Sequence, residues 1–298
     1  MGVLFAMTLS ASILRTFLAA HPAAIVAELT AVRGSSPREA GAFMVIAKDA
    51  MVGTIGGGAL EYMVIDRARQ VLRDGVPADL MDIPLGPEIG QCCGGRVEVS
   101  LRPAGKAEAL LDRLERTEAA RPHVYLFGAG HVGQALARAL APLPLQVHVI
   151  DTRPDELAGL PESIDARALA MPEAAVRSAP AGSSYVILTH DHALDFLIAA
   201  EALKRGDAPY VGMVGSRTKR ARFQSWYLAE AGGDRAAMER LVLPIGGRAF
   251  PDGLGDKRPE VIAALAAAEI MVQIGRREAT QSKLEPVAGV MSGAVDGR

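Results

Sequence analysis

The amino-acid sequence predicts an α/β protein in which a mixed α/β domain is followed by a doubly wound parallel sheet. The chain has 298 residues, of which 50% are hydrophobic and 22% charged, so it can bury the cores of two ordinary domains. From His123 onward, strand-like and helix-like segments alternate, as they do in a parallel sheet covered by helices. A glycine motif at 128–133 follows the first of these strands and opens a helix.

The expected N-terminal domain covers residues 1–105. Its longest helix, at 59–74, is indicated by apolar residues recurring along one face. In chain order we expect a helix at 13–20, a strand at 24–32, a hairpin of strands at 42–47 and 52–55, the helix at 59–74 and a strand at 97–101.

A charged helix at 106–121, ended by Pro122, is the expected connector to the second domain at 122–275. The tail at 276–298 is polar and contains glycine, so we expect it to be disordered. In the second domain we expect strands at 124–127, 146–150, 185–188 and 210–214, and helices at 132–141, 193–204, 219–231 and 259–274.

Composition excludes several classes of function. Lys and Arg total 32 against 34 Asp and Glu, the net charge is −2, and only 4% of residues are aromatic. Proteins that bind nucleic acid usually carry a basic surface and stacking aromatics, so no nucleic-acid partner is expected. No apolar run is long enough to span a bilayer, so no membrane association is expected.

The chain has two cysteines, Cys92 and Cys93, and they are adjacent. Consecutive Cα atoms lie about 3.8 Å apart, closer than the roughly 4.4–6.8 Å of an ordinary disulfide. We therefore expect two free thiols and a reducing, cytoplasmic location.

The clearest motif, Gly128-Ala129-Gly130-His131-Val132-Gly133, has the form G-x-G-x-x-G. Its first glycine permits a tight turn, its second lets the backbone approach a phosphate, and its third lets helix pack on strand. Asp151 ends the next strand, where an acidic residue can meet a ribose hydroxyl. The motif predicts a Rossmann-like domain. Because a fold does not fix its ligand, it leaves open NAD, another phosphate, or a turn kept only for packing.

Two polar clusters, Thr189–His192 and Gly215–Arg220, follow other strands of this domain. The carboxyl ends of parallel strands meet in one crevice, so we expect the clusters near the glycine motif. The first resembles half of a metal site but lacks a third ligand group, so we predict a helix N-cap and no metal. The second could hold an anion at a helix start or form a solvated basic face.

Three glycine-rich loops mark the first domain, at Gly34–Arg38, Gly56–Glu61 and Gly90–Gly95. Glycines beside a thiol let a bulky ligand approach a soft sulfur donor. On spacing alone, three tight turns are the simpler interpretation.

Taken together and in this order, these segments resemble the xanthine dehydrogenase accessory protein family (XdhC/CoxI) across nearly the whole chain. No single signature would suffice, but their order makes the match specific. The signatures are Gly34–Arg38, Gly53–Glu61, Gly90–Gly95, Gly128–Gly133, Thr189–Asp195, Gly215–Arg220, Leu243–Gly246 and Asp256–Ala263.

The resemblance implies an XdhC/CoxI domain at 1–105, a Rossmann-like domain at 122–275, and a chaperone of the molybdenum cofactor (molybdopterin) in place of a turnover enzyme. Such a protein would protect the cofactor, support its sulfuration with a cysteine desulfurase and insert it into the molybdenum-binding subunit of apo xanthine dehydrogenase. A homodimer is also implied.

The family's glycine-flanked cysteine corresponds to Cys92 or Cys93. Many relatives carry another cysteine where this chain has Ala59, which weakens any mechanism that needs two separate thiol loops. The cofactor-binding residues we expect are Cys92, Cys93, Gly57, Gly58, Gly94, Gly128, Gly130, His131, Gly133 and Asp151.

Two other functions stay open. An NAD(P)-dependent oxidoreductase would use the glycine motif and Asp151 for the dinucleotide, with His190 or His192 as proton donor. An interaction scaffold with a vestigial Rossmann domain would bind no small ligand.

Overall fold

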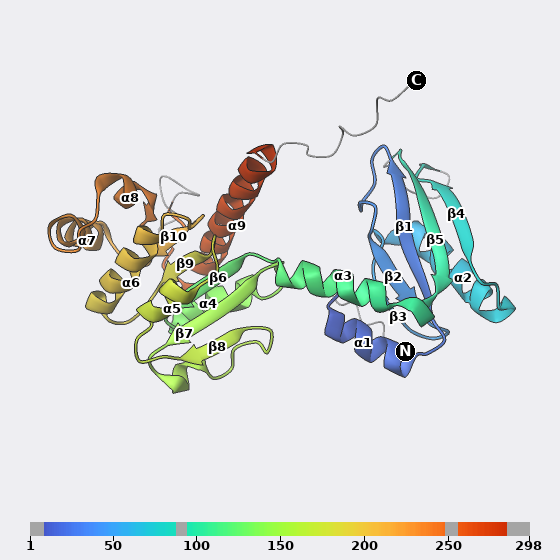
Figure 1. Cartoon of the computed structure of the whole chain (residues 1–298), viewed down its shortest axis with the longest axis horizontal. Helices are drawn as coiled ribbons and strands as arrows, with labels where there is room; N and C mark the ends of the chain where they lie inside the picture. Colours follow the sequence, from blue (N-terminus) through green and yellow to red (C-terminus); the bar gives the residue numbers. More distant parts are fainter. Residues whose placement is uncertain (1–8, 88–93, 248–255, 285–298) are drawn as a thin grey trace, which may run out of the picture. The chain divides into compact units, whose positions relative to one another are not determined.

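The structure is a computed structural model, and it describes residues 9–87, 94–247 and 256–284. It divides into two compact units, Met1–Ala120 and Arg121–Arg298, which Figure 1 colours from blue to green and from green to red. The cysteine pair at 92–93 and the end of the expected tail at 285–298 lie outside the described residues.

The first unit is built on a five-stranded sheet of order β3-β2-β1-β5-β4, and every pair of neighbouring strands is antiparallel. Its centre is β1, in which Ile25 lies opposite Ile46 on one side and Pro103 on the other. The strands are β1 (Ile25–Arg33), β2 (Phe43–Ile46), β3 (Met51–Gly53), β4 (Asp79–Pro84) and β5 (Arg96–Pro103).

Helices cover both faces of this sheet. Successive side chains of a strand point to opposite faces, so Ile25 and Ala27 pack in the cluster that contains α2 (Gly58–Asp74). Val26 packs in the other cluster, with α1 (Ala11–Ala20) and α3 (Glu108–Ala119). A short 3₁₀ turn, η2 (Ala104–Lys106), leads from β5 into α3. The connector segment is thus helical, and its Leu110 is buried in the core of the first unit.

The second unit contains a six-stranded sheet of order β11-β10-β9-β6-β7-β8, with all neighbours parallel (Figure 1). Counted from β6, this is the strand order 3-2-1-4-5-6 of dinucleotide-binding domains. The strands are β6 (His123–Phe127), β7 (Gln146–Asp151), β8 (Asp165–Ala168), β9 (Ser184–Ile187), β10 (Val211–Met213) and β11 (Leu241–Val242).

Its helices lie on both faces, so the predicted doubly wound architecture is confirmed. Val124 and Leu126 of β6 face α4 (His131–Leu140) and α9 (Pro259–Leu284), whereas Tyr125 and Phe127 face the opposite layer. That layer comprises α5 (Glu173–Ser178), α6 (His192–Arg205), α7 (Arg217–Ala229) and α8 (Arg235–Arg240). A separate 3₁₀ turn, η3 (Pro154–Leu157), follows β7.

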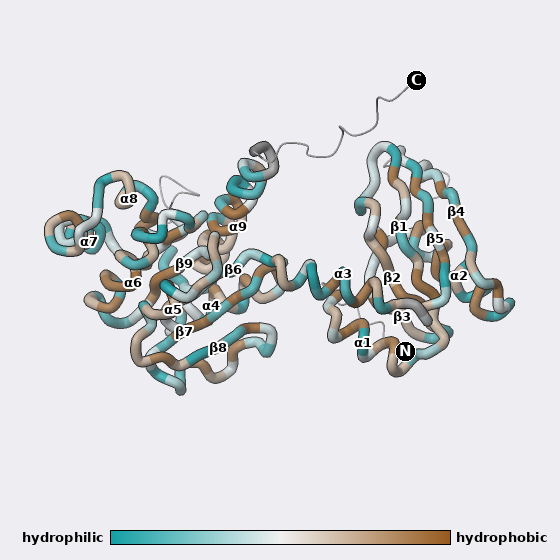
Figure 2. Tube along the Cα trace, viewed as in Figure 1, coloured by the Kyte–Doolittle hydropathy of each residue, from teal (hydrophilic) through white to brown (hydrophobic). Residues whose placement is uncertain are grey.

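The sequence predicts a disordered tail from residue 276. This boundary is too early, because α9 continues to Leu284. Figure 2 shows α9 changing from brown to teal toward this end, so polarity marks a solvated continuation of the helix. Residues 276–283 contain no Pro or Gly and include the good helix formers Arg, Glu, Ala, Gln and Lys. Within the described part of the chain, no helix has the length and hydrophobicity needed to cross a membrane.

Candidate functional site

A buried carboxylate, Glu61, holds the glycine loop at the start of α2. Glu61 is 6% exposed, and its Oε1 accepts hydrogen bonds from the N–H groups of Ile55 (3.0 Å) and Gly57 (2.9 Å). The same oxygen accepts from the Thr54 hydroxyl at 2.5 Å. A carboxylate in the first turn also interacts favourably with the helix dipole. These hydrogen bonds therefore hold the loop in place at the start of α2.

The three glycine-rich loops of the first unit pack against one another. A Cβ atom at Gly56 would lie 2.6 Å from the Pro37 Cγ, and one at Gly95 would lie 2.1 Å from the carbonyl oxygen of Ser35. No residue larger than glycine fits at Gly95 without displacing backbone. We call Gly34–Arg38, Thr54–Glu61 and Gly94–Gly95 the glycine-loop cluster.

The cysteine pair is attached directly to this cluster. Gly94 follows Cys93 in the chain, and its N–H donates to the carbonyl oxygen of Leu85 at 2.8 Å. In return, the Leu85 N–H donates to the carbonyl oxygen of Gly95 at 2.7 Å. These two bonds pair Leu85 with Gly94 and Gly95. Gly94 itself is exposed.

The G-x-G-x-x-G motif of the second unit forms the turn between β6 and α4. A Cβ atom at Gly133 would lie 2.0 Å from the Gly128 carbonyl oxygen, and one at Gly128 would lie 2.4 Å from that of Leu188. These two glycines therefore serve close packing. At Gly130, by contrast, a Cβ would meet nothing within 4 Å. His131, at the start of α4, is exposed.

Asp151 faces the glycine motif but is fully engaged by the protein. Its Oδ2 accepts from the Ala129 N–H (2.8 Å) and the Arg153 guanidinium (3.2 Å), and its Oδ1 accepts from the Arg153 N–H (2.9 Å) and Nε (3.1 Å). Burial raises the pKa of Asp151, but these hydrogen bonds outweigh burial and leave the pKa below its usual value. Four donors match the roughly four acceptor sites of a carboxylate, so a ribose hydroxyl would have to displace the 40% exposed Arg153 side chain, which supplies two of them.

The cluster after β9 starts a helix, as predicted. Asp191 caps α6, and its Oδ1 accepts from the N–H groups of Ala193 (2.7 Å) and Leu194 (3.3 Å). These bonds lower the pKa of Asp191. In the part of the chain that the structure describes, no group of three His, Cys, Asp or Glu side chains could hold a metal ion.

Sequence reasoning missed a buried ion pair between the two polar clusters. Lys219 on α7 donates to Asp195 on α6, whose side chain is 0% exposed, and to the Val214 carbonyl oxygen at 2.9 Å. Asp195 also accepts from the N–H (3.0 Å) and hydroxyl (2.7 Å) of Thr189. The only sequence signal was that both residues fall within the signatures at 189–195 and 215–220.

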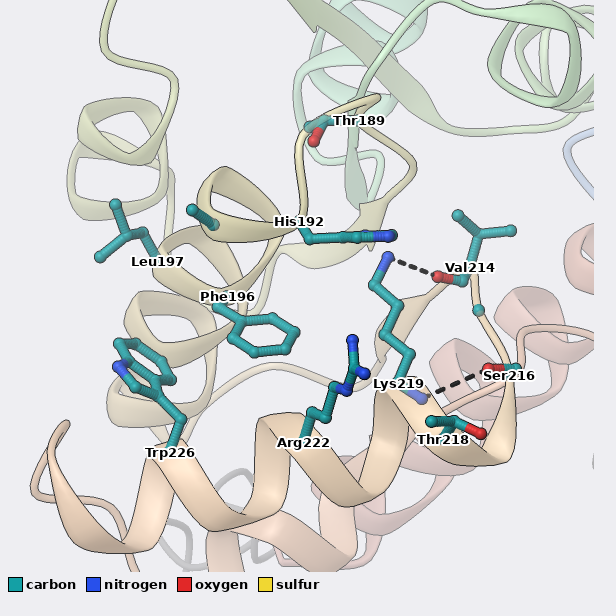
Figure 3. A pocket seen from close by; sticks show the side chains of 12 residues that line it. Thr189, His192, Phe196, Leu197, Val214, Ser216, Thr218, Lys219, Arg222 and Trp226 are labelled. Carbon is teal, nitrogen blue, oxygen red and sulfur yellow. Dashed lines mark hydrogen bonds between the residues drawn. The ribbon is translucent and has the colours of Figure 1, made fainter.

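A cavity of about 740 Å³ opens beside this pair, between α6 and α7 (Figure 3). Thr189 lines both this cavity and a smaller pocket formed with Gly128 and Asp151. The two polar clusters and the glycine motif therefore share the carboxyl edge of the parallel sheet, as expected from the strand order.

This fold and its site define a two-domain α/β protein whose second unit is a Rossmann-like domain with an open glycine turn. Residues 17–84 match the family model for the XdhC and CoxI family, and residues 124–270 match the model for the XdhC Rossmann domain. The chain belongs to the XdhC family, which confirms the resemblance found in the sequence.

A curated relative and a solved structure extend the comparison. The chain is 28% identical over 251 residues to the uncharacterized protein YqeB of Escherichia coli K12, covering 83% of this chain and 42% of YqeB. It thus spans less than half the length of that relative. A crystal structure described as a xanthine dehydrogenase from Bacillus halodurans has the same fold, with a TM-score of 0.71 and 19% identity, over 95% of this chain and 98% of that one.

Proposed function

We propose that this chain is a molybdenum-cofactor chaperone in the maturation of xanthine dehydrogenase. Membership of the XdhC family supports the maturation role. Cofactor binding rests on one observation: the glycine loops pack closely at Gly95, while Gly94, the residue that follows Cys93, leaves open space beside its backbone.

In this proposal the first unit binds the molybdenum end of the cofactor. Cys92 and Cys93 supply soft thiolates suited to a molybdenum–sulfur centre. Gly94, the residue after Cys93, is exposed, and Gly58 begins α2 at its positive end. The Gly57 N–H donates to Glu61, which holds this loop, and a Cβ at Gly57 would meet nothing within 4 Å, so a ligand can approach the backbone there.

We further propose that Gly128, Gly130, His131 and Gly133 form a phosphate-binding turn, oriented by Asp151. Gly130 is where a ligand can approach the backbone. Asp151 already accepts four hydrogen bonds, which argues against NAD and therefore against the oxidoreductase alternative.

The proposed partners follow from the same role. They are the molybdenum-binding subunit of apo xanthine dehydrogenase as recipient, a cysteine desulfurase for sulfuration, and a second copy of this chain in a cytoplasmic homodimer.

The first experiment measures molybdenum retained by the purified chain after anaerobic gel filtration with molybdenum cofactor. We expect stoichiometric retention by the wild type and loss of retention when Cys92→Ser and Cys93→Ser are combined. Each single variant shows which thiol contributes. Titrations with NAD(H) and NADP(H) run on the same preparation. Nicotinamide binding without cofactor retention would overturn the proposal in favour of the oxidoreductase.

A matched pair of glycine variants tests the glycine-loop cluster. Gly57 and Gly75 lie at opposite ends of α2, both have positive φ, and a Cβ at either would meet nothing within 4 Å. Gly57 (φ 81°, ψ −179°) lies in a region that only glycine adopts readily, so Gly57→Ala costs more strain than Gly75→Ala (φ 66°, ψ 24°), and circular dichroism checks that both variants are folded. We expect only Gly57→Ala to weaken cofactor retention, and equal weakening by both would remove the cluster from the site.

A further inference from the structure

The cavity between α6 and α7 has walls of different chemistry. Phe196, Leu197 and Trp226 form an apolar wall, with the rings of Phe196 and Trp226 at a centroid distance of 5.6 Å (Figure 3). The opposite wall is the polar start of α7, from which Lys219 and Arg222 extend toward His192. A cavity of about 740 Å³ with few polar groups on an apolar lining has the size and character of a small-molecule site.

The charge of this cavity favours an anion. Lys219 is neutralised by Asp195, whereas Arg222 is exposed and forms no ion pair with the residues that the structure describes. His192 Nδ1 lies 3.9 Å from the Asp195 carboxylate, so Asp195 already faces two basic groups. First-turn residues of α7 line the cavity, and its N-terminus, which is capped by the uncharged Ser216, carries partial positive charge, whereas the Asp191 carboxylate offsets that of α6.

We propose that this cavity binds a planar heteroaromatic ring that carries a phosphate group. The ring would pack against Phe196 and Trp226, since aromatic side chains stack on flat ring systems. The phosphate would bind the Arg222 guanidinium, whose planar donors suit bidentate binding, beside the N-terminus of α7. The buried Asp195–Lys219 pair holds the two helices that form the site.

This proposal goes beyond the chaperone role, because it uses neither the cysteines nor the glycine-loop cluster. Two sources share the ligand chemistry, a nucleoside monophosphate and a pterin phosphate. The pterin source alone rests on the proposed function, since a pterin phosphate is part of the molybdenum cofactor.

The chain offers a direct readout, because Trp226 is its one tryptophan and lines the cavity. We would titrate the full chain with adenosine monophosphate and with a pterin phosphate while following Trp226 fluorescence. Adenosine and inorganic phosphate serve as the half-ligands, and free tryptophan corrects for absorption by the ligands. Calorimetry on the same samples provides a second readout.

We expect saturable quenching by at least one phosphate-bearing ring, with affinity about tenfold or more above that of either half-ligand. Arg222→Gln should weaken binding about tenfold, by loss of a charge-assisted hydrogen bond. Arg217→Gln is the matched control, since Arg217 is exposed on the same helix but does not line the cavity. If the pterin phosphate binds more tightly, the cavity takes part in binding the molybdenum cofactor. If the nucleotide binds more tightly, the cavity has a ligand other than that cofactor.

Absence of saturable binding by either ring phosphate would overturn the proposal. So would equal affinity for adenosine and its monophosphate, or equal effects of Arg222→Gln and Arg217→Gln. None of these results depends on Cys92 or Cys93, so failure here and failure of cofactor retention are distinguishable.

Discussion

Asp151 joins the end of β7 to the glycine motif through its bond to the Ala129 N–H, and it also holds the Arg153 side chain. We predict that Asp151→Asn destabilises the second unit by roughly 2 kcal/mol at neutral pH, because an amide cannot accept all these hydrogen bonds. The measurement is urea unfolding followed by Trp226 fluorescence, since the one tryptophan lies in this unit.

The same substitution carries a pH signature. The pKa of Asp151 is lowered in the folded state, so its stabilisation is fully present above the unfolded value of about 3.9. It is lost as pH falls through the lower pKa of the folded state. In Asp151→Asn, the free energy of unfolding should therefore fall less than in the wild type as the pH decreases through this range. Asp155→Asn, at an exposed position of η3, should change stability by less than about 0.5 kcal/mol, and an equal loss there would contradict the assignment.

Single residues also show where sequence reasoning ends. The positions of Gly128, Gly133 and Asp151 around one turn were predictable, because the motif fixes a local strand–turn–helix geometry. The Asp195–Lys219 pair was not predictable, since it joins residues on different helices that each read as an ordinary first-turn charge. Whether the glycines bind a ligand stays a prediction.

At the scale of elements, α4 packs against β6 through Gly133, while Gly130 leaves the turn open. We predict that Gly133→Ala destabilises the second unit by roughly 1–3 kcal/mol, because its Cβ would overlap the Gly128 carbonyl oxygen. Gly130→Ala should cost less than about 1 kcal/mol and still obstruct any ligand that approaches the backbone. Unfolding midpoints from Trp226 fluorescence test both. A larger loss for Gly130→Ala than for Gly133→Ala would show that the two glycines have the opposite roles.

Elements with a strong hydrophobic pattern were predictable, and polar ones were not. The helix predicted at 59–74 is observed at Gly58–Asp74, because one apolar face packs on the sheet. β8 was missed, since all four of its residues are exposed at the sheet edge and leave no alternation to detect. β4 was also missed. It is an edge strand that contains two aspartates and ends in proline, and these residues are uncommon in strands. The end of α9 was missed because it is polar.

For the whole molecule, alternation of strands and helices was enough to predict the parallel sheet of the second unit. The first unit was predicted only as mixed α/β, because sequence pattern does not show that β5 returns beside β1 to place both β1 neighbours antiparallel. Contacts between residues far apart in the chain decide that arrangement. The same is true of the glycine-loop cluster, whose three loops lie far apart in sequence.

Each unit has its own hydrophobic core, since every cluster of buried residues in the described part of the chain lies within one unit. We therefore predict that they unfold as separate cooperative steps. Gly95→Ala should destabilise the first unit by roughly 1–3 kcal/mol, because its Cβ would overlap the Ser35 carbonyl oxygen. With a typical urea dependence, the first unit's midpoint should fall by about 1 M.

Far-ultraviolet circular dichroism reports both units, whereas Trp226 fluorescence reports the second unit alone. For Gly95→Ala we expect part of the dichroism transition to move to lower urea while the Trp226 transition stays in place. Gly105→Ala is the control, since a Cβ at Gly105 would meet nothing within 4 Å and its φ is not positive. If Gly95→Ala moved the Trp226 transition equally, the prediction would be wrong and the chain would unfold as one cooperative unit. Destabilisation at the glycine-loop cluster would then also lower the stability of the Rossmann-like domain.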